Sequence, residues 1–235
     1  MTQLEFVAQD RDNPYVNALL YGGPKTGKTV GAATSPGPVL YVNADSPNAT
    51  RFAHRADFTS EIKEVKATGL STLIDVTNEL LENVQEYGSV VVDPVGDLYR
   101  KVLEDLSGRA LSPRLNEYGD TGTHLERFCR ALCDLPLNAI FVAHETAVKD
   151  EADGGFERLP YMGTNNPAPG AKLMAMVDVI GYTGVKVNED KSVSYVAQLY
   201  NGHGRRGGDR FGVLGKTRDI NISEWVDLTR PVIAA

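Results

Sequence analysis

The chain is poor in cysteine and in long apolar runs. It has only two cysteines in 235 residues, Cys129 and Cys133, which fall at i and i+4 on an expected helix. Because no further cysteine can complete a zinc site, we interpret both as free thiols, which fits a reducing compartment. No stretch approaches the roughly 18 apolar residues of a membrane span, and no signal peptide is visible. We therefore expect a cytoplasmic protein with no membrane partner.

Positive charge is also scarce. The chain has 24 Lys and Arg against 31 Asp and Glu, which gives a formal net charge of −7. This excludes a polybasic surface over the whole molecule, so any contact with nucleic acid must be local. The share of hydrophobic residues, 42%, is ordinary for a soluble globular protein, and the length suits one α/β domain.

Against this background, one motif is complete. It reads Gly22-Gly23-Pro24-Lys25-Thr26-Gly27-Lys28-Thr29 and is followed by Val30. In such a loop the glycines let backbone N–H groups cradle phosphate oxygens, Lys28 reaches the β and γ phosphates, and the Thr29 hydroxyl ligates Mg²⁺. An apolar run precedes the loop and a helical turn can follow it, which is the setting that the motif requires. The loop predicts binding of a nucleoside triphosphate with Mg²⁺.

Strand-like and helix-like segments alternate along the chain, which is typical of a parallel sheet with crossover helices. Strands are expected at 16–21, 38–42, 61–66, 89–93, 138–144, 177–186 and 192–200, and helices at 27–33, 71–85, 96–106, 122–135 and 221–229. The segments 107–121 and 146–170 are rich in Gly, Pro and polar residues, and we expect them to be long loops. Loops of this length in a compact domain are usually functional or disordered.

Asp93 ends the run Val90-Val91-Val92-Asp93, which is typical of a buried parallel strand. The carboxyl end of such a strand lies at the edge where open α/β sheets bind ligands, so Asp93 is suited to hold Mg²⁺ together with Thr29. The alternative is an Asp that caps a following helix, because Pro94 stands at a helix-start position. The phosphate loop upstream favours the metal-binding interpretation.

Polar residues follow two other strands. Asp45 comes after the second strand, where it is a candidate general base for an attacking water or, equally, part of an Asx turn. His144 and Glu145 end another strand, where they are candidates for sensing the terminal phosphate of the nucleotide. A histidine that is simply satisfied at a strand end is the alternative.

A basic, glycine-rich segment lies near the C-terminus, between Gly202 and Gly212. Arg205, Arg206 and Arg210 stand among glycines there, a composition that suits phosphate contact. They are candidates for contact with a neighbouring subunit's nucleotide or with nucleic acid. A solvated basic turn is the alternative.

The order and spacing of these features resemble the RecA-like ATPases over about residues 15–215. The residues that carry the resemblance are the phosphate loop, Asp45, Val90-Val91-Val92-Asp93, His144-Glu145 and Asp209-Arg210-Phe211-Gly212. Within that family, Pro24–Thr29 and the strand ending in His-Glu are most similar to the phage-borne Sak single-strand-annealing group. The resemblance implies an α/β fold with a mostly parallel central sheet flanked by helices and a C-terminal antiparallel hairpin. It also implies one RecA-like core over 1–235, with a short extension at 1–14 and a tail from about 217 to 235.

The resemblance implies a catalytic set made of Lys28, Asp45, His144, Glu145 and Arg210. Asp45 stands where RecA has Glu, and Glu145 stands where the family's sensor pair has Gln. Arg210 matches the family's arginine that contacts ATP across a subunit interface, while Gly208 stands where that element has Lys. The resemblance therefore implies a homo-oligomer, a ring or a filament, in which Arg210 acts in trans.

The two segments expected to be loops match the positions of the family's DNA-binding loops. Together with the C-terminal arginines, they give Arg109, Arg114, Lys149, Arg158, Arg205 and Arg206 as candidate contacts with single-stranded DNA. The segment 145–160 is acidic, which opposes phosphate binding. Phe156 and Tyr161 are nevertheless suited to stack on bases.

We therefore expect a Mg²⁺-dependent ATPase, weak or DNA-stimulated, that acts on single-stranded DNA in phage recombination, annealing or replication. Its expected partners are ATP, single-stranded DNA, further copies of itself and a phage single-strand-binding protein, in the host cell cytoplasm. The alternative is a RecA core that regulates or assembles protein partners without binding DNA. A small-molecule kinase is disfavoured because no Arg-rich lid is evident.

Overall fold

A ten-stranded sheet organises the computed structural model, which describes residues 14–233 apart from 47–49, 52–59, 109–111 and 150–154. The order across the sheet is β10 (Thr217–Asp219), β8 (Val193–Gln198), β7 (Val179–Val187), β1 (Ala18–Gly22), β5 (Asn138–Lys149), β4 (Ser89–Asp93), β2 (Val39–Asn43) and β3 (Ile62–Lys66). Off this path, β6 (Phe156–Tyr161) pairs with β5, and β9 (Gly208–Asp209) pairs with β7.

The strands from β7 to β3 are mutually parallel, whereas β6, β8, β9 and β10 pair antiparallel to their neighbours. The α/β fold with a mostly parallel sheet and a C-terminal antiparallel hairpin, expected from the sequence, is confirmed. Because β1, β4 and β5 are parallel, their carboxyl ends meet at one edge of the sheet, and residues that follow these strands lie near one another.

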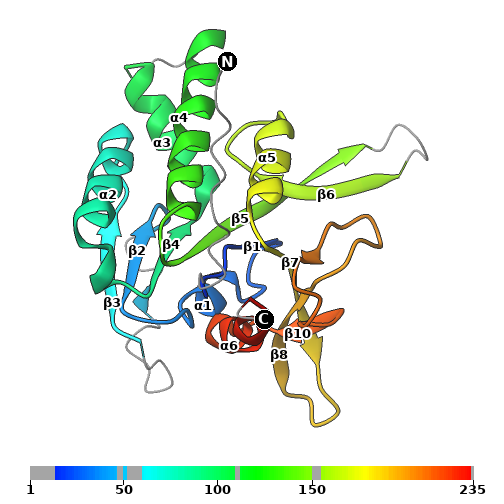
Figure 1. Ribbon diagram of the computed structural model, residues 1–235. Helices are drawn as coiled ribbons and strands as arrows, with labels where there is room; N and C mark the ends of the chain where they lie inside the picture. Colours follow the sequence, from blue (N-terminus) through cyan, green and yellow to red (C-terminus); the bar gives the residue numbers. More distant parts are fainter. Residues whose placement is uncertain (1–13, 47–49, 52–59, 109–111, 150–154, 234–235) are drawn as a thin grey trace, which may run out of the picture.

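Helices cover both faces of the sheet (Figure 1). One face packs on α2 (Leu70–Asn83), α3 (Val95–Leu106), α4 (Leu115–Cys133) and α5 (Ala168–Met176), and a short 3-10 turn, Val84–Glu86, extends α2. The other face packs on α1 (Lys28–Ala32) and α6 (Ile222–Ile233). Every residue of β1, β2 and β4 is buried, as expected for parallel strands covered on both sides.

The first segment expected to be a loop, 107–121, is partly helical, so that expectation is wrong. Helix α4 begins at Leu115, seven residues before the expected start at 122. The Glu117 carboxylate accepts a hydrogen bond of 2.5 Å from the Arg114 backbone N–H, and the Thr121 hydroxyl donates to the Glu117 carbonyl. These local bonds stabilise a first turn that has few apolar residues to signal it. Cys129 and Cys133 are free thiols on this helix.

In the second such segment, 146–170, most of the described residues belong to strands or to helix α5, so the expectation of a long loop is wrong there as well. Strand β5 continues to Lys149, and β6 returns antiparallel to it, from the pair Lys149↔Phe156 to the pair His144↔Tyr161. Pro160 is accommodated because β6 is an edge strand, where a missing N–H costs no ladder hydrogen bond. The resulting β5–β6 hairpin projects from the body of the molecule (Figure 1).

The C-terminal segment is integrated into the sheet and the core. From residue 217 onward, β10 pairs with β8, and α6 packs against the face that also holds α1. Trp225 is fully buried, and its indole Nε1–H donates to the Asp219 carbonyl over 3.0 Å. Apart from Pro14, the extension expected at 1–14 lies outside the described residues. Over the described part of the chain, no helix has the length and apolarity to cross a membrane.

Trp225 should dominate the stability of this C-terminal packing. Replacing a buried aromatic side chain by alanine typically costs about 3–5 kcal/mol, so we expect Trp225→Ala to lower the free energy of unfolding by that amount. Leu228→Ala, at a 37% exposed position on the same helix, should change it by less than about 0.5 kcal/mol. Urea unfolding followed by far-UV circular dichroism measures both. Equal effects of the two variants would show that α6 is not held by Trp225.

Candidate functional site

The phosphate loop joins β1 to α1 in a conformation that its glycines make possible. Gly27, directly before α1, has a left-handed φ of 84°. A Cβ atom there would lie 2.4 Å from the Tyr195 ring, and one at Gly22 would lie 2.6 Å from the Thr183 hydroxyl. Side chains at either position would displace β7 or β8. The glycines of the motif are therefore required by the neighbouring strands as well as by the turn.

Lys28 places its ammonium group inside this loop. The side chain is buried, and Nζ donates to the carbonyls of Gly22 and Gly23 over 3.0 and 2.5 Å. Burial lowers the pKa of Lys28, while the nearby Asp93 and Glu145 carboxylates oppose that shift. The loop thus has a cation at its centre and carboxylates from two neighbouring strands within electrostatic range.

Asp93 lies at the base of the loop, at the end of β4, and is almost completely buried. The Tyr41 hydroxyl donates to Asp93 Oδ2 over 2.5 Å, and the Thr29 side chain also bonds to Asp93. Burial raises the pKa of Asp93, and the charge of Asp45 adds to this, whereas the bonds from Tyr41 and Thr29 and the charge of Lys28 oppose it. The N-cap residue of α3 is Pro94, and the bonds recorded for the Asp93 carboxylate come from Tyr41 and Thr29, so a capping role for Asp93 is not observed.

The Thr29 hydroxyl and the Asp93 carboxylate therefore converge, as the sequence interpretation required of a Mg²⁺ site. Mg²⁺ is commonly held by one or two protein oxygens while keeping waters and substrate phosphate oxygens as its other ligands. This donor pair fits such an ion. Among the described residues, no group of three or more His, Cys, Asp or Glu could hold a metal alone. When bound, the ion would neutralise developing phosphate charge.

Asp45 follows β2 on the same edge of the sheet, with its side chain exposed. Its backbone N–H donates to the Asn43 side-chain oxygen over 3.0 Å, so an Asx-type turn does form here, through Asn43. The Asp45 carboxylate remains near enough to affect the pKa of Asp93. Glu64 on β3, which sequence reasoning missed, accepts a 2.7 Å hydrogen bond from Asn43 and so fixes the end of β2.

His144 and Glu145 occupy different environments. His144 pairs with Gly22 across β1 and β5 and is exposed. Glu145 Oε2 accepts a 2.8 Å hydrogen bond from the Tyr182 hydroxyl, and its Oε1 accepts one of 2.6 Å from Arg158. The same Oε1 lies 3.9 Å from the Cβ position of Gly23. Glu145 therefore connects the phosphate loop to β7 and to the β5–β6 hairpin.

Arg210 lies at the opposite edge of the sheet. Its guanidinium pairs with Asp178 at 2.5 Å, directly before β7, and Asp178 also accepts from the backbone N–H of Asn17, directly before β1. Since β1 rises about 3.3 Å per residue, its five residues separate this pair from the loop by roughly 16 Å. Arg210 is therefore remote from the phosphate loop of its own chain.

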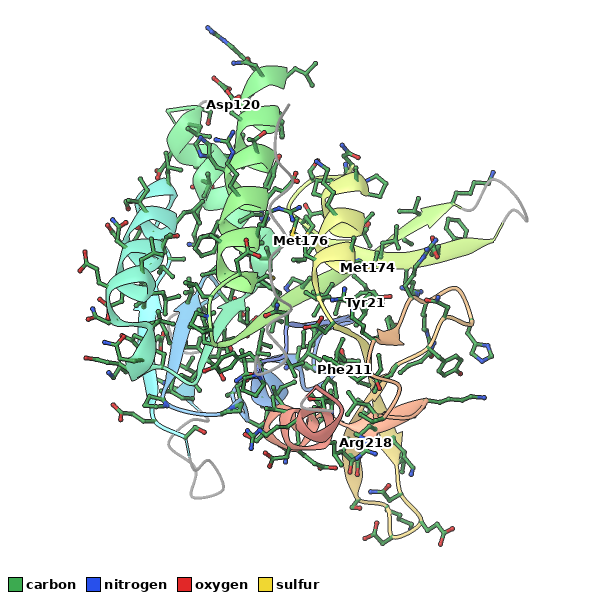
Figure 2. All side chains as sticks on the ribbon, viewed as in Figure 1. Tyr21, Asp120, Met174, Met176, Phe211 and Arg218 are labelled. Carbon is green, nitrogen blue, oxygen red and sulfur yellow. The ribbon has the colours of Figure 1, made fainter. Side chains whose placement is uncertain are left out.

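Four of the six candidate DNA contacts come together beside the β5–β6 hairpin. Lys149 and Arg158 belong to the hairpin, and Arg205 and Arg206 belong to the neighbouring segment. Arg158 and Arg205 form a bridge between the two. The Tyr21 hydroxyl, at the base of the hairpin (Figure 2), lies 3.1 Å from the Arg158 carbonyl and 2.7 Å from the Arg206 carbonyl, either of which can accept its hydrogen. Arg114 lies apart from this group, directly before α4, and Arg109 lies outside the described residues.

A groove of about 590 Å³ lies where the hairpin and this segment meet. It is lined by Gly155, Phe156, Glu157, Asn201, Gly202, His203, Gly204, Arg205 and Arg206. Phe156 is 67% exposed, and the Arg205 guanidinium lies 4.5 Å from the centre of the Tyr182 ring. Arg206 is paired with Glu157 at 2.6 Å. Aromatic, cationic and acidic side chains thus share one concave surface.

The burial of Asp93 gives a pH-dependent prediction. An acid whose pKa is raised by folding loses its proton at a lower pH in the unfolded state than in the folded state. As pH rises above its ordinary pKa, about 4, the unfolded state is therefore favoured and the stability of the fold decreases. We therefore expect Asp93→Asn and the wild type to be equally stable below about pH 4. Above that pH the variant should be the more stable of the two, because it has no buried charge to form.

Thermal unfolding of both proteins between pH 3.5 and 8, without nucleotide, measures this difference. Asp97→Asn, on the first turn of α3, is the control, since Asp97 bonds to the exposed Arg100 rather than to buried hydroxyls. A lower stability of Asp93→Asn at every pH would mean that the hydrogen bonds from Tyr41 and Thr29 outweigh the cost of the buried charge.

Comparisons with known proteins identify the family and the fold of the chain. Residues 15–211 match the model of an AAA domain family, AAA_24, while none of the curated proteins matches the chain. A KaiC-like protein from the hyperthermophilic archaeon Pyrococcus horikoshii OT3 is similar in fold, at 14% identity and a TM-score of 0.50 over 87% of this chain and 84% of that one. An ATPase from the type III secretion system of pathogenic bacteria is 11% identical, with a TM-score of 0.47 over 74% and 51% of the two chains. The chain belongs to the AAA domain family AAA_24 and is a P-loop ATPase with a RecA-like fold.

Proposed function

We propose that this protein hydrolyses ATP with Mg²⁺ and uses the nucleotide state to control binding of single-stranded DNA in the groove beside the β5–β6 hairpin. The observation that carries the proposal is the position of Glu145. One carboxylate lies beside the phosphate loop and at the same time holds Arg158, a residue of the hairpin. A change at the loop therefore has a direct physical route to the groove.

Each residue of the site has a role that follows from its position. Lys28 holds the terminal phosphates, and Thr29 and Asp93 hold the metal. Asp45, exposed at the end of β2, is the candidate base that orients water. Glu145 responds to charge at the loop, because a phosphate beside Gly23 repels its carboxylate and competes for its cationic partner Arg158.

The groove has the chemistry that single-stranded DNA requires. Phe156 offers an exposed aromatic face for a base, and Arg205 and Arg206 offer cations for the backbone. The Arg205 guanidinium lies over the Tyr182 ring, and its buried Nε–H has no hydrogen-bond acceptor among the described residues. The likeness of Pro24–Thr29 to the phage Sak group supports a role in strand annealing or recombination, together with a phage single-strand-binding protein.

A second candidate function is regulation or assembly of protein partners without DNA binding. The observation that favours it is the pairing of cations in this region. Arg158 is paired with Glu145, and Arg206 is paired with Glu157. DNA would have to displace these carboxylates, whereas a protein partner with mixed charges would not. Salt dependence of DNA binding separates the two functions, because contacts with phosphates release counterions.

We also propose that the active form is a homo-oligomer, a ring or a filament. Arg210 is remote from its own phosphate loop, so it is suited to a neighbouring chain's nucleotide. In that arrangement its guanidinium would exchange Asp178 for phosphate oxygens of the neighbour, as an arginine finger does.

The proposed binding of single-stranded DNA is tested by measuring ATP hydrolysis with and without single-stranded DNA at 50 and 200 mM salt. We expect DNA to stimulate turnover, Lys28→Ala to abolish it, and Phe156→Ala to weaken DNA affinity about tenfold through loss of stacking. Arg205→Ala should reduce the salt slope of binding by about one. Leu115→Ala, at a distant and 89% exposed position, is the control. Absence of both stimulation and salt-sensitive binding would favour the protein-partner function.

The trans role of Arg210 is tested by mixing two inactive variants. Lys28→Ala lacks the loop cation and Arg210→Ala lacks the finger, but a mixed oligomer contains some interfaces with both groups intact. We expect the mixture to recover up to about a quarter of wild-type turnover, whereas each variant alone stays more than about a hundredfold slower. Asp178→Asn, which weakens the same ion pair while keeping Arg210, should stay active. Full activity of Arg210→Ala alone would remove Arg210 from the mechanism.

A further inference from the structure

The β7–β8 hairpin presents an apolar face that the sheet does not cover. Val185, Val187, Val193 and Tyr195 are between 42% and 67% exposed. Val185 is paired with Tyr195 and Val187 with Val193, and the four side chains therefore lie on one face of the hairpin. Exposed apolar residues that gather on one face of a structure usually mark a binding surface.

This face borders the phosphate loop directly. The Tyr195 ring packs on Gly27, where a Cβ atom would lie only 2.4 Å from the ring. Pairing of β1 with β7 stops at Tyr182, but β7 continues to Val187. The last residues of β7 and the first of β8 therefore extend past the end of β1, as the projecting hairpin in Figure 1 shows. The four side chains form a wall beside the loop, which we call the hairpin wall.

The order of the strands determines which part of a bound nucleotide faces this wall. The groups suited to the terminal phosphate and its metal, Glu145 and Asp93, come from β5 and β4, on one side of β1. The hairpin wall lies on the other side of β1, because β7 and β8 follow it in the sheet. A nucleotide whose terminal phosphate points toward Asp93 must extend its nucleoside toward β7 and β8.

We propose that the hairpin wall binds the nucleoside part of the nucleotide, with the base stacked on the free face of Tyr195 and flanked by the three valines. The three valines have no polar side-chain atoms, and the Tyr195 hydroxyl can both donate and accept, so the side chains of the wall offer no fixed set of donors and acceptors that would distinguish adenine from guanine. The site therefore accepts ATP and GTP with similar affinity. The inference rests on nucleotide binding at the loop and is independent of the proposed binding of DNA.

Calorimetric titration of the Mg²⁺-loaded protein with ATP, GTP and inorganic tripolyphosphate tests the wall separately from the loop. Tripolyphosphate reports on the phosphate loop alone, because it has no nucleoside. We expect Tyr195→Ala to weaken ATP and GTP binding about tenfold and to leave tripolyphosphate binding unchanged, since stacking of one base contributes on that scale. Tyr195→Phe should bind all three as the wild type does. Tyr118→Ala, at a similarly exposed tyrosine on α4, is the matched control.

A second variant guards against an indirect effect through Gly27. The double substitution Val187→Ala and Val193→Ala changes the wall at the pair farther from Gly27, and it should weaken ATP several-fold with tripolyphosphate unaffected. Equal loss of ATP and tripolyphosphate in Tyr195→Ala, wild-type ATP affinity in both variants, or a preference for ATP over GTP above a hundredfold would each overturn the proposal. Lys28→Ala should weaken all three ligands, so a failed loop and a failed wall give different results.

Discussion

A buried carboxylate connects the parts of this site. Asp93 ends the central strand β4, and it is bonded by Tyr41 from β2 and by Thr29 from the phosphate loop. Burial of the charge is unfavourable, as the raised pKa shows, and it is tolerated because hydroxyl donors and the nearby Lys28 ammonium offset part of the cost. Two strands and the loop are thereby fixed relative to one another at the edge where the nucleotide binds.

The two sides of β1 have different surroundings. Toward β5, Glu145 connects the loop to Arg158 and the β5–β6 hairpin, so the charge of the terminal phosphate has a path to the groove. Toward β7, the Tyr195 ring packs on Gly27, on the side where we propose that the nucleoside of a bound nucleotide lies. The order of strands thus separates the proposed phosphate contacts from the proposed base contacts, and Arg210 lies at the opposite edge of the sheet, remote from both.

The sequence predicted the parallel strands well and the connections poorly. Runs such as Val90–Val92 are apolar because both faces of the sheet are covered, so they stand out without any knowledge of the fold. The start of α4 contains glycines and polar residues, so no periodic apolar pattern predicts a helix there. It is stabilised by the local hydrogen bond from the Arg114 N–H to the Glu117 carboxylate. Strand β6 contains Pro160, and its sequence is typical of a loop. Because β6 is an edge strand that pairs with β5, it tolerates the missing backbone N–H of Pro160.

The phosphate loop, the strand-end carboxylates and the fold class follow from the sequence alone, because each depends on neighbouring residues or on a short repeated pattern. Only the tertiary structure decided that Tyr41 bonds to Asp93, that Arg158 and Tyr182 hold Glu145, and that Tyr195 lies on Gly27. These partners are between 13 and 168 residues apart in the chain, and most belong to different strands. Strand order and register bring them together, and both are set by the packing of the whole sheet between its two layers of helices rather than by any local signal.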